Sequence, residues 1–361
     1  MKRKILSLMV AACSPFMFVN ESDACTGISL SAKDGSYIYA RTIEWGGSEL
    51  NSQYVIVPRG YEHQAFTIKG QGMTFKSKYG YVGLSVEQKE FVAEGINEVG
   101  LSAGLFYFPN YGEYEAFDEA KRSSSISDLQ LVSWILANCS TIEEVKEKIK
   151  DIHVVAIDPR ASTVHWRIAE PTGKQVVLEI VDGKLNFYDN KVGVITNSPG
   201  FEWHVANLNN YVNLYPGSAQ SQNIGEEKIS QFGAGSGFLG MPGDVTPPSR
   251  FVRAAFYKAS APQKQTAYET VEQSFQILNN FDIPIGIEFL SSQTPTDIPS
   301  ATQWTSVTDT KNRKIYFRTM YNSTIRCIDL NKIDFNSVGY KFVPMDKDKK
   351  QPVEEICVTN I

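Results

Sequence analysis

The residue with the clearest capacity for chemistry is Cys25, in the stretch Ser22-Asp23-Ala24-Cys25-Thr26-Gly27. If the chain is cut after Ala24, Cys25 becomes the first residue and carries a thiol and a free α-amine on the same Cα. A deprotonated thiol is a strong nucleophile. An α-amine, with an unperturbed pKa near ~8, can act as a base at neutral pH. One cleavage would therefore create a nucleophile and its base in a single residue.

The residues before Cys25 have the layout of a secretory signal peptide. Basic residues at positions 2–4 precede an uncharged, mainly apolar run at 5–19, and Ser22 and Ala24 are the small residues of a cleavage site. The run is short and is interrupted by Pro15, which argues against a membrane span. We therefore expect residues 1–24 to be removed, the mature chain 25–361 to be exported to the periplasm or secreted, and no stable membrane insertion.

Cys13 offers an alternative of another class. The stretch Val10-Ala11-Ala12-Cys13 resembles a lipoprotein acceptor site. Lipidation there would leave the nitrogen of Cys25 in a peptide bond and would fit a lipid-anchored surface or binding protein with Cys25 in a disulfide. We favour cleavage at Cys25 because the basic start and the small residues before it both fit that reading.

The composition excludes some classes of protein and favours others. A formal charge of −5 and a pI near 5.6 argue against nucleic-acid partners. A hydrophobic fraction of 42% allows a large core, and the absence of an internal repeat or a linker favours one catalytic domain over 25–361. Cys25, Cys139, Cys327 and Cys357 allow three disulfide schemes, and no spacing indicates a zinc site.

The first hairpin is expected to bring a cation to Cys25. Residues 27–31 alternate as a strand, 33–35 form a turn, and 37–41 return. Arg41 then lies near the thiol, where a guanidinium would lower the thiol pKa. The alternative is an arginine on the surface of the strand. Glu44 follows where the chain leaves the strand.

Two later residues, Asn197 and Arg250, have polar or charged side chains at the end of a strand and at the start of a helix. Asn197 follows a strand at 192–196, where its amide is well placed as an oxyanion donor, although a turn asparagine is the simpler interpretation. Arg250 lies in the first turn of a helix that opens at 247. A cation opposes the helix dipole there, which favours a functional explanation.

Phe106, Tyr107 and Phe108 belong to an aromatic run at 105–111. The run is either the end of a core strand or the apolar wall of a substrate pocket. Position alone does not separate these alternatives.

The remaining pattern predicts layered α+β structure with antiparallel sheets. We expect further strands at 53–57, 81–86, 100–106, 285–289, 303–308, 314–319 and 323–329, and a central meander at 152–157, 163–169, 175–181 and 184–188. Helices are expected at 127–138, from 141, at 201–211, from 247 and at 266–279.

Taken together, the residues resemble the choloylglycine hydrolase family of N-terminal nucleophile hydrolases, which includes bile salt hydrolases and penicillin V acylases. The markers are Cys25-Thr26-Gly27, Ala40-Arg41-Thr42-Ile43-Glu44-Trp45, Thr196-Asn197-Ser198-Pro199 and the stretch from Gly243 to Phe251. The resemblance covers essentially all of the mature chain. It implies a four-layer αββα sandwich, frequently assembled as a homotetramer.

The resemblance also implies roles. Cys25 would be the nucleophile, Arg41 the arginine beside the thiolate, Asn197 the oxyanion donor together with a main-chain N–H, and Arg250 a second active-site arginine. Glu44 stands where most members have the aspartate that holds the α-amine. The expected reaction is hydrolysis of a linear amide in a small molecule, without a metal or organic cofactor.

The expected substrates are glycine- or taurine-conjugated bile acids, with penicillin V as the alternative. Bile-salt members frequently have Gly-Leu-Asn-aromatic-Pro, whereas this chain has Gly104-Leu105-Phe106-Tyr107-Phe108-Pro109, and tyrosine is a feature of penicillin-type members. An alternative enzyme hypothesis is a Cys–His hydrolase, in which Cys25 acts together with His204.

Overall fold

A computed structural model describes residues 23–158 and 162–358, and two antiparallel sheets dominate it. The expected signal peptide therefore lies outside the described residues, except for its last two positions. The smaller sheet has the order β14-β1-β2-β17-β18-β19. Its strands are β1 (Asp23–Ser31), β2 (Tyr37–Trp45), β14 (Val194–Ile195), β17 (Thr302–Asp309), β18 (Lys314–Thr319) and β19 (Arg326–Asp329).

The larger sheet has the order β13-β12-β11-β8-β7-β6-β3-β20. Its strands are β3 (Gln53–Val57), β6 (Tyr81–Ser85), β7 (Val92–Asn97), β8 (Ser102–Tyr107), β11 (Val164–Ala169), β12 (Gln175–Val181), β13 (Lys184–Asp189) and β20 (Lys341–Pro344). Its neighbouring strands pair antiparallel, as the hairpin-rich sequence predicts.

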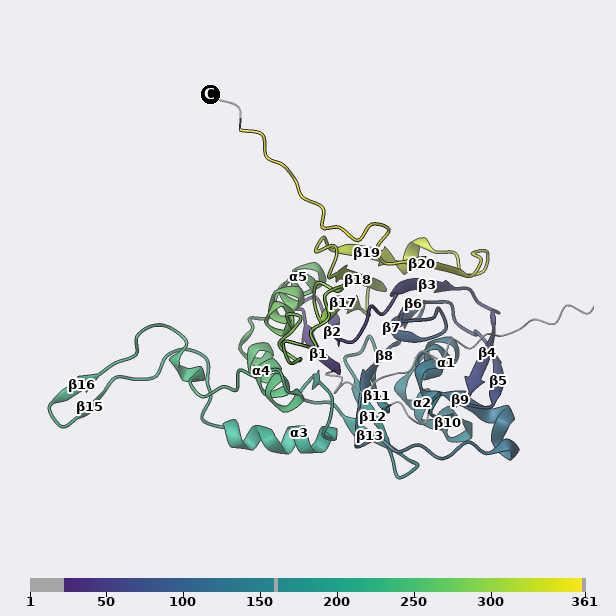
Figure 1. The fold of residues 1–361 in the computed structure, drawn as a ribbon, viewed down its shortest axis with the longest axis horizontal. Helices are drawn as coiled ribbons and strands as arrows, with labels where there is room; N and C mark the ends of the chain where they lie inside the picture. The colour runs from purple at the N-terminus through teal and green to yellow at the C-terminus, as the bar shows by residue number, and fades with distance from the viewer. Residues whose placement is uncertain (1–22, 159–161, 359–361) are drawn as a thin grey trace, which may run out of the picture.

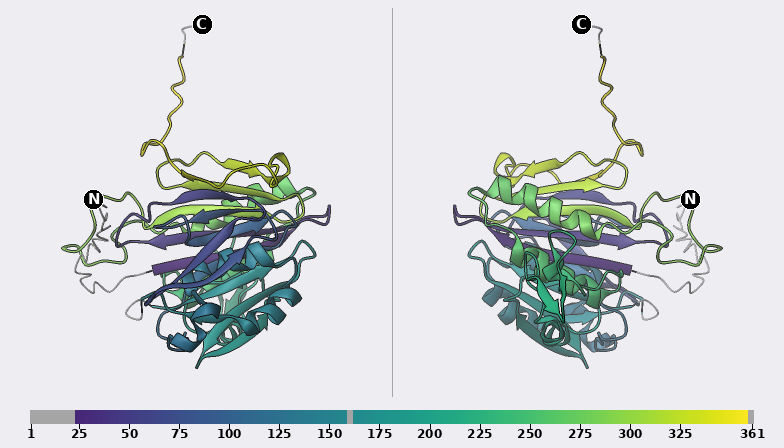
Figure 2. Two further views of the ribbon diagram at one scale, coloured as in Figure 1. Left: turned by 90° about the vertical axis from the view of Figure 1, so that its right-hand side faces the viewer. Right: turned by 90° about the vertical axis from the view of Figure 1, so that its left-hand side faces the viewer.

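Helices cover the outer face of each sheet (Figures 1 and 2). Helices α4 (Pro247–Ser260) and α5 (Ala267–Leu278) pack on β1 and β2, while α1 (Leu131–Asn138) packs on β7 and β8. Helix α2 (Ile142–Lys148) lies beside α1. The inner faces meet where β1 contacts β8 and where β7 contacts β18. This confirms the predicted αββα sandwich.

The position of β2 inside the sandwich explains why it can hold buried polar groups. Covered on both faces, seven of its nine residues are buried. Arg41 and Glu44 are among them, with 1% and 2% of their surfaces exposed. A charged side chain buried this deeply requires partners, so this strand is where specific chemistry is to be expected.

The short elements show where the sequence pattern misled. β7, β4 (Glu62–Thr67) and β5 (Gly70–Lys76) were not predicted, because glycines and polar residues break their alternation. The strand predicted at 285–289 is wrong: these residues form turns, with Gly286 at a φ of +95°. The segment predicted at 152–157 is not part of the meander, because β10 (His153–Val155) pairs parallel with β9 (Ser125–Ser127).

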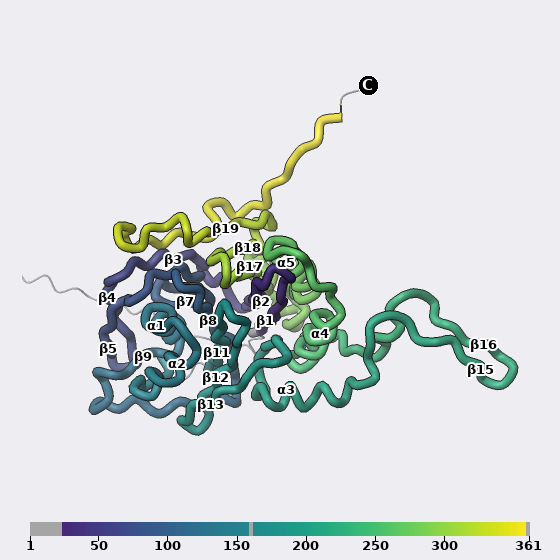
Figure 3. Tube along the Cα trace, turned by 180° about the vertical axis from the view of Figure 1, so that it is seen from behind, coloured from purple at the N-terminus to yellow at the C-terminus, as the bar shows by residue number. Residues whose placement is uncertain are grey.

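An arm at residues 212–245 projects from the sandwich between α3 (Phe201–Asn207) and α4 (Figures 1 and 3). It contains the hairpin of β15 (Gln222–Ile224) and β16 (Glu227–Ile229) and a short 3-10 turn at Ser236–Phe238. Within the described part of the chain, no helix is both long and apolar enough to cross a bilayer.

Candidate active site

The first hairpin places a guanidinium on the thiol of Cys25. In the register of β1 and β2, Cys25 lies opposite Ile43, and Arg41 lies opposite Gly27. The Arg41 side chain reaches the sulfur, with Nη2 2.8 Å from Sγ. Arg41 is therefore buried and not a surface arginine.

Main-chain carbonyl groups hold the rest of the Arg41 guanidinium. Nη1 donates to the carbonyl oxygens of Leu105, at 2.6 Å, and Ala93, at 3.2 Å. The ring of Phe106 lies 4.2 Å from the guanidinium carbon, a cation–π distance. These contacts fix the charge at one point beside the sulfur.

Asn197 and Arg250 meet at the main chain of Cys25. Asn197 Oδ1 accepts hydrogen bonds from Cys25 N at 3.0 Å and from Arg250 Nη2 at 2.6 Å. Arg250 Nη1 donates to Cys25 O at 2.6 Å and to Thr26 Oγ1 at 2.8 Å. The predicted Cys25, Arg41, Asn197 and Arg250 thus form one hydrogen-bonded cluster drawn from β1, β2, the segment after β14, and α4.

The small residue at position 27 permits close packing beside this cluster. A Cβ on Gly27 would lie 2.7 Å from Ile195 Cγ2 and 2.9 Å from Phe106 Cζ. Thr26 faces the opposite side of β1, where its hydroxyl accepts from Arg250. Each residue of the Cys-Thr-Gly stretch therefore has a role: Cys25 and Thr26 form hydrogen bonds within the cluster, and Gly27 allows close packing beside it.

The thiol pKa reflects a competition between burial and charge. Burial raises the pKa of Cys25, whereas the Arg41 guanidinium, the Tyr107 main-chain N–H and Arg250 lower it, and Glu44 raises it further. The predicted effect of the arginines is confirmed, because both lower the thiol pKa. Burial is the larger effect, so the net shift of the Cys25 pKa is upward.

Glu44 lies in the same buried region, opposite Ala24 in the β1–β2 register. Its Oε1 is 3.4 Å from Thr302 Oγ1, and its Oε2 has no hydrogen-bond partner among the described residues. Burial raises the pKa of Glu44 to about 8, although Arg250, Thr42 and Arg41 oppose that shift. Glu288 lies close enough to raise it further.

The aromatic run divides between core and surface. Phe106 and Phe108 have no exposed surface, and their rings contact the Arg41 guanidinium and the His165 ring. Tyr107 is partly exposed, and Tyr111, at the end of the run, is exposed. The burial of Phe106 and Phe108 favours the core-strand alternative for these two residues. Substrate binding by Phe106, Tyr107 and Phe108 stays a prediction.

Two buried histidines contact the main chain at Asn197 and at the residue before it, and the sequence did not predict these contacts. His204 Nε2 is 2.9 Å from the Asn197 carbonyl oxygen, and His165 Nε2 is 3.1 Å from that of Thr196. Burial lowers the pKa of His204 to about 4, which makes it a weak base. The geometry therefore gives no support to the Cys–His hydrolase with His204 as the base.

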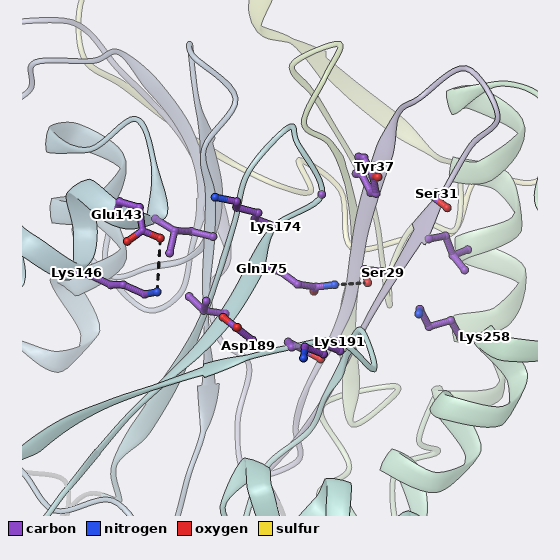
Figure 4. A pocket seen from close by; sticks show the side chains of 15 residues that line it. Ser29, Ser31, Tyr37, Glu143, Lys146, Lys174, Gln175, Asp189, Lys191 and Lys258 are labelled. Atoms are coloured by element: carbon purple, nitrogen blue, oxygen red, sulfur yellow. Dashed lines mark hydrogen bonds and ion pairs between the residues drawn. The ribbon is translucent and has the colours of Figure 1, made fainter.

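The site is closed in the full-length chain, in which residues 1–24 have not been removed. Ala24 and Cys25 are each only 4% exposed, and Ala24 packs in a small apolar cluster with Ile283 and Ala301. A cavity of about 540 Å³ lies instead at the far end of β1, lined by Ser29, Ser31, Gln175 and four lysines (Figure 4). Neither this cavity nor a second one of about 400 Å³ is lined by Cys25.

Neither a disulfide nor a metal cluster accompanies the site in residues 23–158 and 162–358. Cys25, Cys139, Cys327 and Cys357 are all free thiols. The described residues also hold no group of three or more His, Cys, Asp or Glu side chains arranged for a metal ion. The alternative in which Cys25 forms a disulfide is therefore not supported.

The chain is similar to known amide hydrolases along most of its length. The family model described as "Linear amide C-N hydrolases, choloylglycine hydrolase family" matches residues 25–343. A bile salt hydrolase/transferase of Clostridium perfringens is 34% identical over 327 residues, covering 88% of this chain and 97% of the relative. A penicillin V acylase of Pectobacterium atrosepticum is 23% identical, covering 91% and 86%.

The fold has solved counterparts. A variant of the conjugated bile acid hydrolase from Clostridium perfringens superposes with a TM-score of 0.80 at 31% identity, covering 92% of this chain and 100% of the other. The penicillin V acylase of Agrobacterium tumefaciens gives a TM-score of 0.70 at 24% identity, covering 89% and 92%, and shares the fold.

Proposed function

Since this chain belongs to the choloylglycine hydrolase family of linear amide hydrolases, we propose that Cys25, as the first residue of the mature protein, is its nucleophile. The observation that carries the proposal is the contact of 2.8 Å between Arg41 Nη2 and Cys25 Sγ, at a residue whose main-chain nitrogen is held by Asn197. The match to the family begins at Cys25, which supports removal of residues 1–24.

The first half-reaction forms an acyl-enzyme. The thiolate of Cys25 attacks the amide carbonyl, the C–S bond forms, and negative charge moves to the carbonyl oxygen. Asn197 Nδ2 donates one hydrogen to Tyr107 O at 2.8 Å and keeps a second for this oxyanion. One such donor is typically worth roughly 3 kcal/mol in the transition state. The main-chain N–H of Tyr107, which donates to the sulfur here, is the candidate partner donor.

The α-amine completes both half-reactions. It passes the thiol proton to the leaving nitrogen, the C–N bond breaks, and the amine departs. It then takes a proton from water as the hydroxide attacks the thioester, which releases the carboxylic acid and restores the thiol. Glu44 is the group proposed to orient the amine, because it pairs with Ala24, the residue before Cys25, and its Oε2 has no hydrogen-bond partner among the described residues.

Conjugated bile acids are the substrate class we propose. The support is the 34% identity to a bile salt hydrolase/transferase over 97% of that relative. Penicillin V is the second candidate, supported by the more distant acylase and by the partly exposed Tyr107. We also propose that the mature protein is periplasmic or secreted and forms a homo-oligomer.

A parallel assay tests the proposal. Release of the amine from glycocholate, taurocholate and penicillin V is measured for the mature wild-type protein and for Cys25→Ala. We expect turnover fastest on a bile salt and absent in the variant, whose circular dichroism and melting temperature match the wild type. Turnover by Cys25→Ala at a rate near that of the wild type would refute the mechanism.

A further inference from the structure

The segment that carries Asn197 is held from both sides by buried histidines. We propose that His165 and His204 are positioning residues for the oxyanion donor, each fixing one main-chain carbonyl group of residues 196–197. This inference rests on the proposed function, because it assumes that Asn197 stabilises the oxyanion. The two histidines come from different elements, β11 and α3, so they converge on the segment independently.

His204 holds the carbonyl group of Asn197 itself. The ring is 2% exposed and stacks on Phe251, with centroids 4.7 Å apart and planes at 11°. Burial lowers its pKa to about 4, so the ring is neutral near pH 7 and has one N–H. Nε2 faces the Asn197 oxygen at 2.9 Å, while Nδ1 has no partner in the described part of the chain. The proton therefore belongs on Nε2.

His165 holds the preceding carbonyl group, that of Thr196, at 3.1 Å from Nε2. Its Nδ1 lies 3.2 Å from Glu179 Oε1, and the ring stacks on Phe108 at 4.4 Å and 6°. The ring therefore lies between the Thr196 carbonyl group and the Glu179 side chain, and these two contacts fix its orientation.

Glu179 connects the two histidines. Its Oε1 also accepts a hydrogen bond of 2.8 Å from Phe201 N, at the start of the helix that carries His204. One carboxylate therefore ties β11 to α3, and the two rings hold successive peptide groups between them. The amide of Asn197 is then aimed by its backbone as well as by its contacts to Cys25 and Arg250.

The consequence is specific to the transition state. Displacement of the segment would move the second hydrogen of Asn197 Nδ2 away from the oxyanion, while the Arg41–Cys25 contact would stay. A misplacement of about 1 Å can cost on the order of 100-fold in rate. We expect a loss of roughly tenfold to 100-fold in kcat with little change in KM, because the interaction strengthens only as the oxyanion forms.

Matched variants test the idea. His165→Phe and His204→Phe keep the ring stacking but remove the N–H, whereas His165→Gln and His204→Gln restore an N–H near the position of Nε2. His63→Phe is the control, because His63 also stacks on a phenylalanine ring, Phe75, at 4.5 Å but contacts Ser77 instead of the Asn197 segment. Each protein is assayed for kcat, KM, melting temperature and the rate of Cys25 alkylation by iodoacetamide.

The expected result is a tenfold or greater fall in kcat for both site Phe variants, recovery of most of it in the Gln variants, and no change in His63→Phe or in alkylation. Unchanged kcat in the site Phe variants, or no recovery with Gln, would overturn the inference. The inference would also be overturned if kcat in the site Phe variants fell in proportion to the rate of Cys25 alkylation, because the thiol and not the oxyanion donor would then be affected. If Cys25→Ala is inactive while these variants are fully active, this inference fails and the proposed function stands.

The wild-type protein gives a second readout that does not depend on folding of the variants. Nitrogen-15 spectra of the imidazole groups should show His204 as the neutral Nε2–H tautomer at pH 7. A His204 proton on Nδ1 would overturn the assignment, since Nε2 could then not donate to the Asn197 carbonyl oxygen.

Discussion

Main-chain carbonyl groups, more than carboxylates, hold the buried cations around Cys25. Arg41 donates to the carbonyl oxygens of Ala93 and Leu105, and Arg250 donates to those of Cys25 and Val245. Neutral acceptors satisfy the guanidinium groups without cancelling their charge. Each arginine therefore keeps its effect on the thiol and on the developing oxyanion.

Replacing Arg41 should cost both stability and thiol reactivity. Arg41→Met leaves the carbonyl groups of Ala93 and Leu105 without a buried donor, which should lower the free energy of unfolding by about 2–4 kcal/mol. Alkylation of Cys25 should also slow, because the thiolate loses its cation. Urea denaturation and iodoacetamide kinetics measure the two effects.

Arg59→Met is the matched control, since Arg59 pairs with Glu98 at the surface, where solvent screens the pair and its loss should change stability little. Equal stability and equal alkylation rates in the two variants would contradict this assignment.

Glu44 makes the stability of the leader-bearing chain depend on pH. Its pKa is raised by burial from 4.5 to about 8, so the folded state binds a proton that the unfolded state has released between these values. The contribution of Glu44 to stability is thus fully present below about pH 4.5 and is lost as the pH rises through about 8. Glu44→Gln should flatten this part of the profile.

Urea titrations of the full-length chain from pH 5 to pH 8 measure this effect. In the mature protein the α-ammonium group would offset the fall, so its profile should be flatter than that of the leader-bearing chain. Identical slopes for Glu44→Gln and the wild type would show that another group controls the profile.

Sequence reasoning succeeded at residues whose position in an element fixes their neighbours. Hairpin geometry brought Arg41 toward Cys25 but left a surface arginine open. The strand end allowed Asn197 as an oxyanion donor, although a turn asparagine was the simpler interpretation. The histidines at 165 and 204 were missed as positioning residues because their partners are main-chain carbonyl groups, which leave no pattern in the sequence. Phe106 and Phe108 were ambiguous because an aromatic strand end looks the same whether it faces the core or a pocket.

At the scale of elements, the close approach of β1, β14 and the Phe106 ring depends on Gly27. Gly27→Ala would place a methyl group 2.7 Å from Ile195 Cγ2 and 2.9 Å from Phe106 Cζ. Overpacking of this kind typically costs about 1–3 kcal/mol. Because Phe106 lies on the Arg41 guanidinium, kcat should fall as well.

Thermal melts and steady-state kinetics of Gly27→Ala test this expectation. Gly339→Ala is the control, because an added methyl group at this exposed glycine meets no atom within 4 Å. Wild-type kcat and stability in Gly27→Ala would show that the strand interface is not tightly packed at this point.

The continuity of β1 across residue 24 constrains when the leader can be removed. Ala24 pairs with Glu44 within the sheet and is 4% exposed, so the bond before Cys25 is inaccessible once β1 has paired. We expect a protease added to the folded full-length chain to leave this bond intact, and to cut it only in urea. Mass spectrometry of the products decides this, and rapid cutting of the native chain at Ala24 would contradict it.

The elements themselves were predictable where alternation and turn residues agree. β3, β12 and β18 match the prediction at both ends, since each is a short strand between clear turns. β7 failed because its sequence, Val92–Asn97, contains a glutamate and a glycine. Glu94 is tolerated there because it pairs with Arg167, a contact between two strands that local patterns do not reveal.

At the scale of the whole molecule, the arm at 212–245 presents apolar side chains that the sandwich does not cover. Val212, Leu239 and Ile224 are 86%, 83% and 65% exposed, and Phe232 is fully exposed. Exposed apolar groups gathered on one projection are typical of an interaction site. We propose that the arm makes the contacts of a homo-oligomer, the tetramer that the family resemblance implies.

Replacement of Phe232 and Leu239 by lysine should dissociate this oligomer, because each charge would have to be buried at the contact. Light scattering coupled to size-exclusion chromatography measures the mass. The control substitution is Asn223→Lys. Asn223 is a polar residue of the hairpin in the same arm, where it pairs with Lys228. A wild-type protein that is already monomeric would contradict the proposal.

The central claim is that Cys25 acts as a first-residue nucleophile, and one measurement tests it most directly. The active enzyme is mixed with a bile-salt substrate, quenched in acid within milliseconds and digested, and the N-terminal peptide is weighed by mass spectrometry. We predict a peptide that begins at Cys25 and carries the mass of the acyl group on its thiol. An active protein that retains an intact Ala24–Cys25 bond, or an acyl group on another residue, would contradict the account.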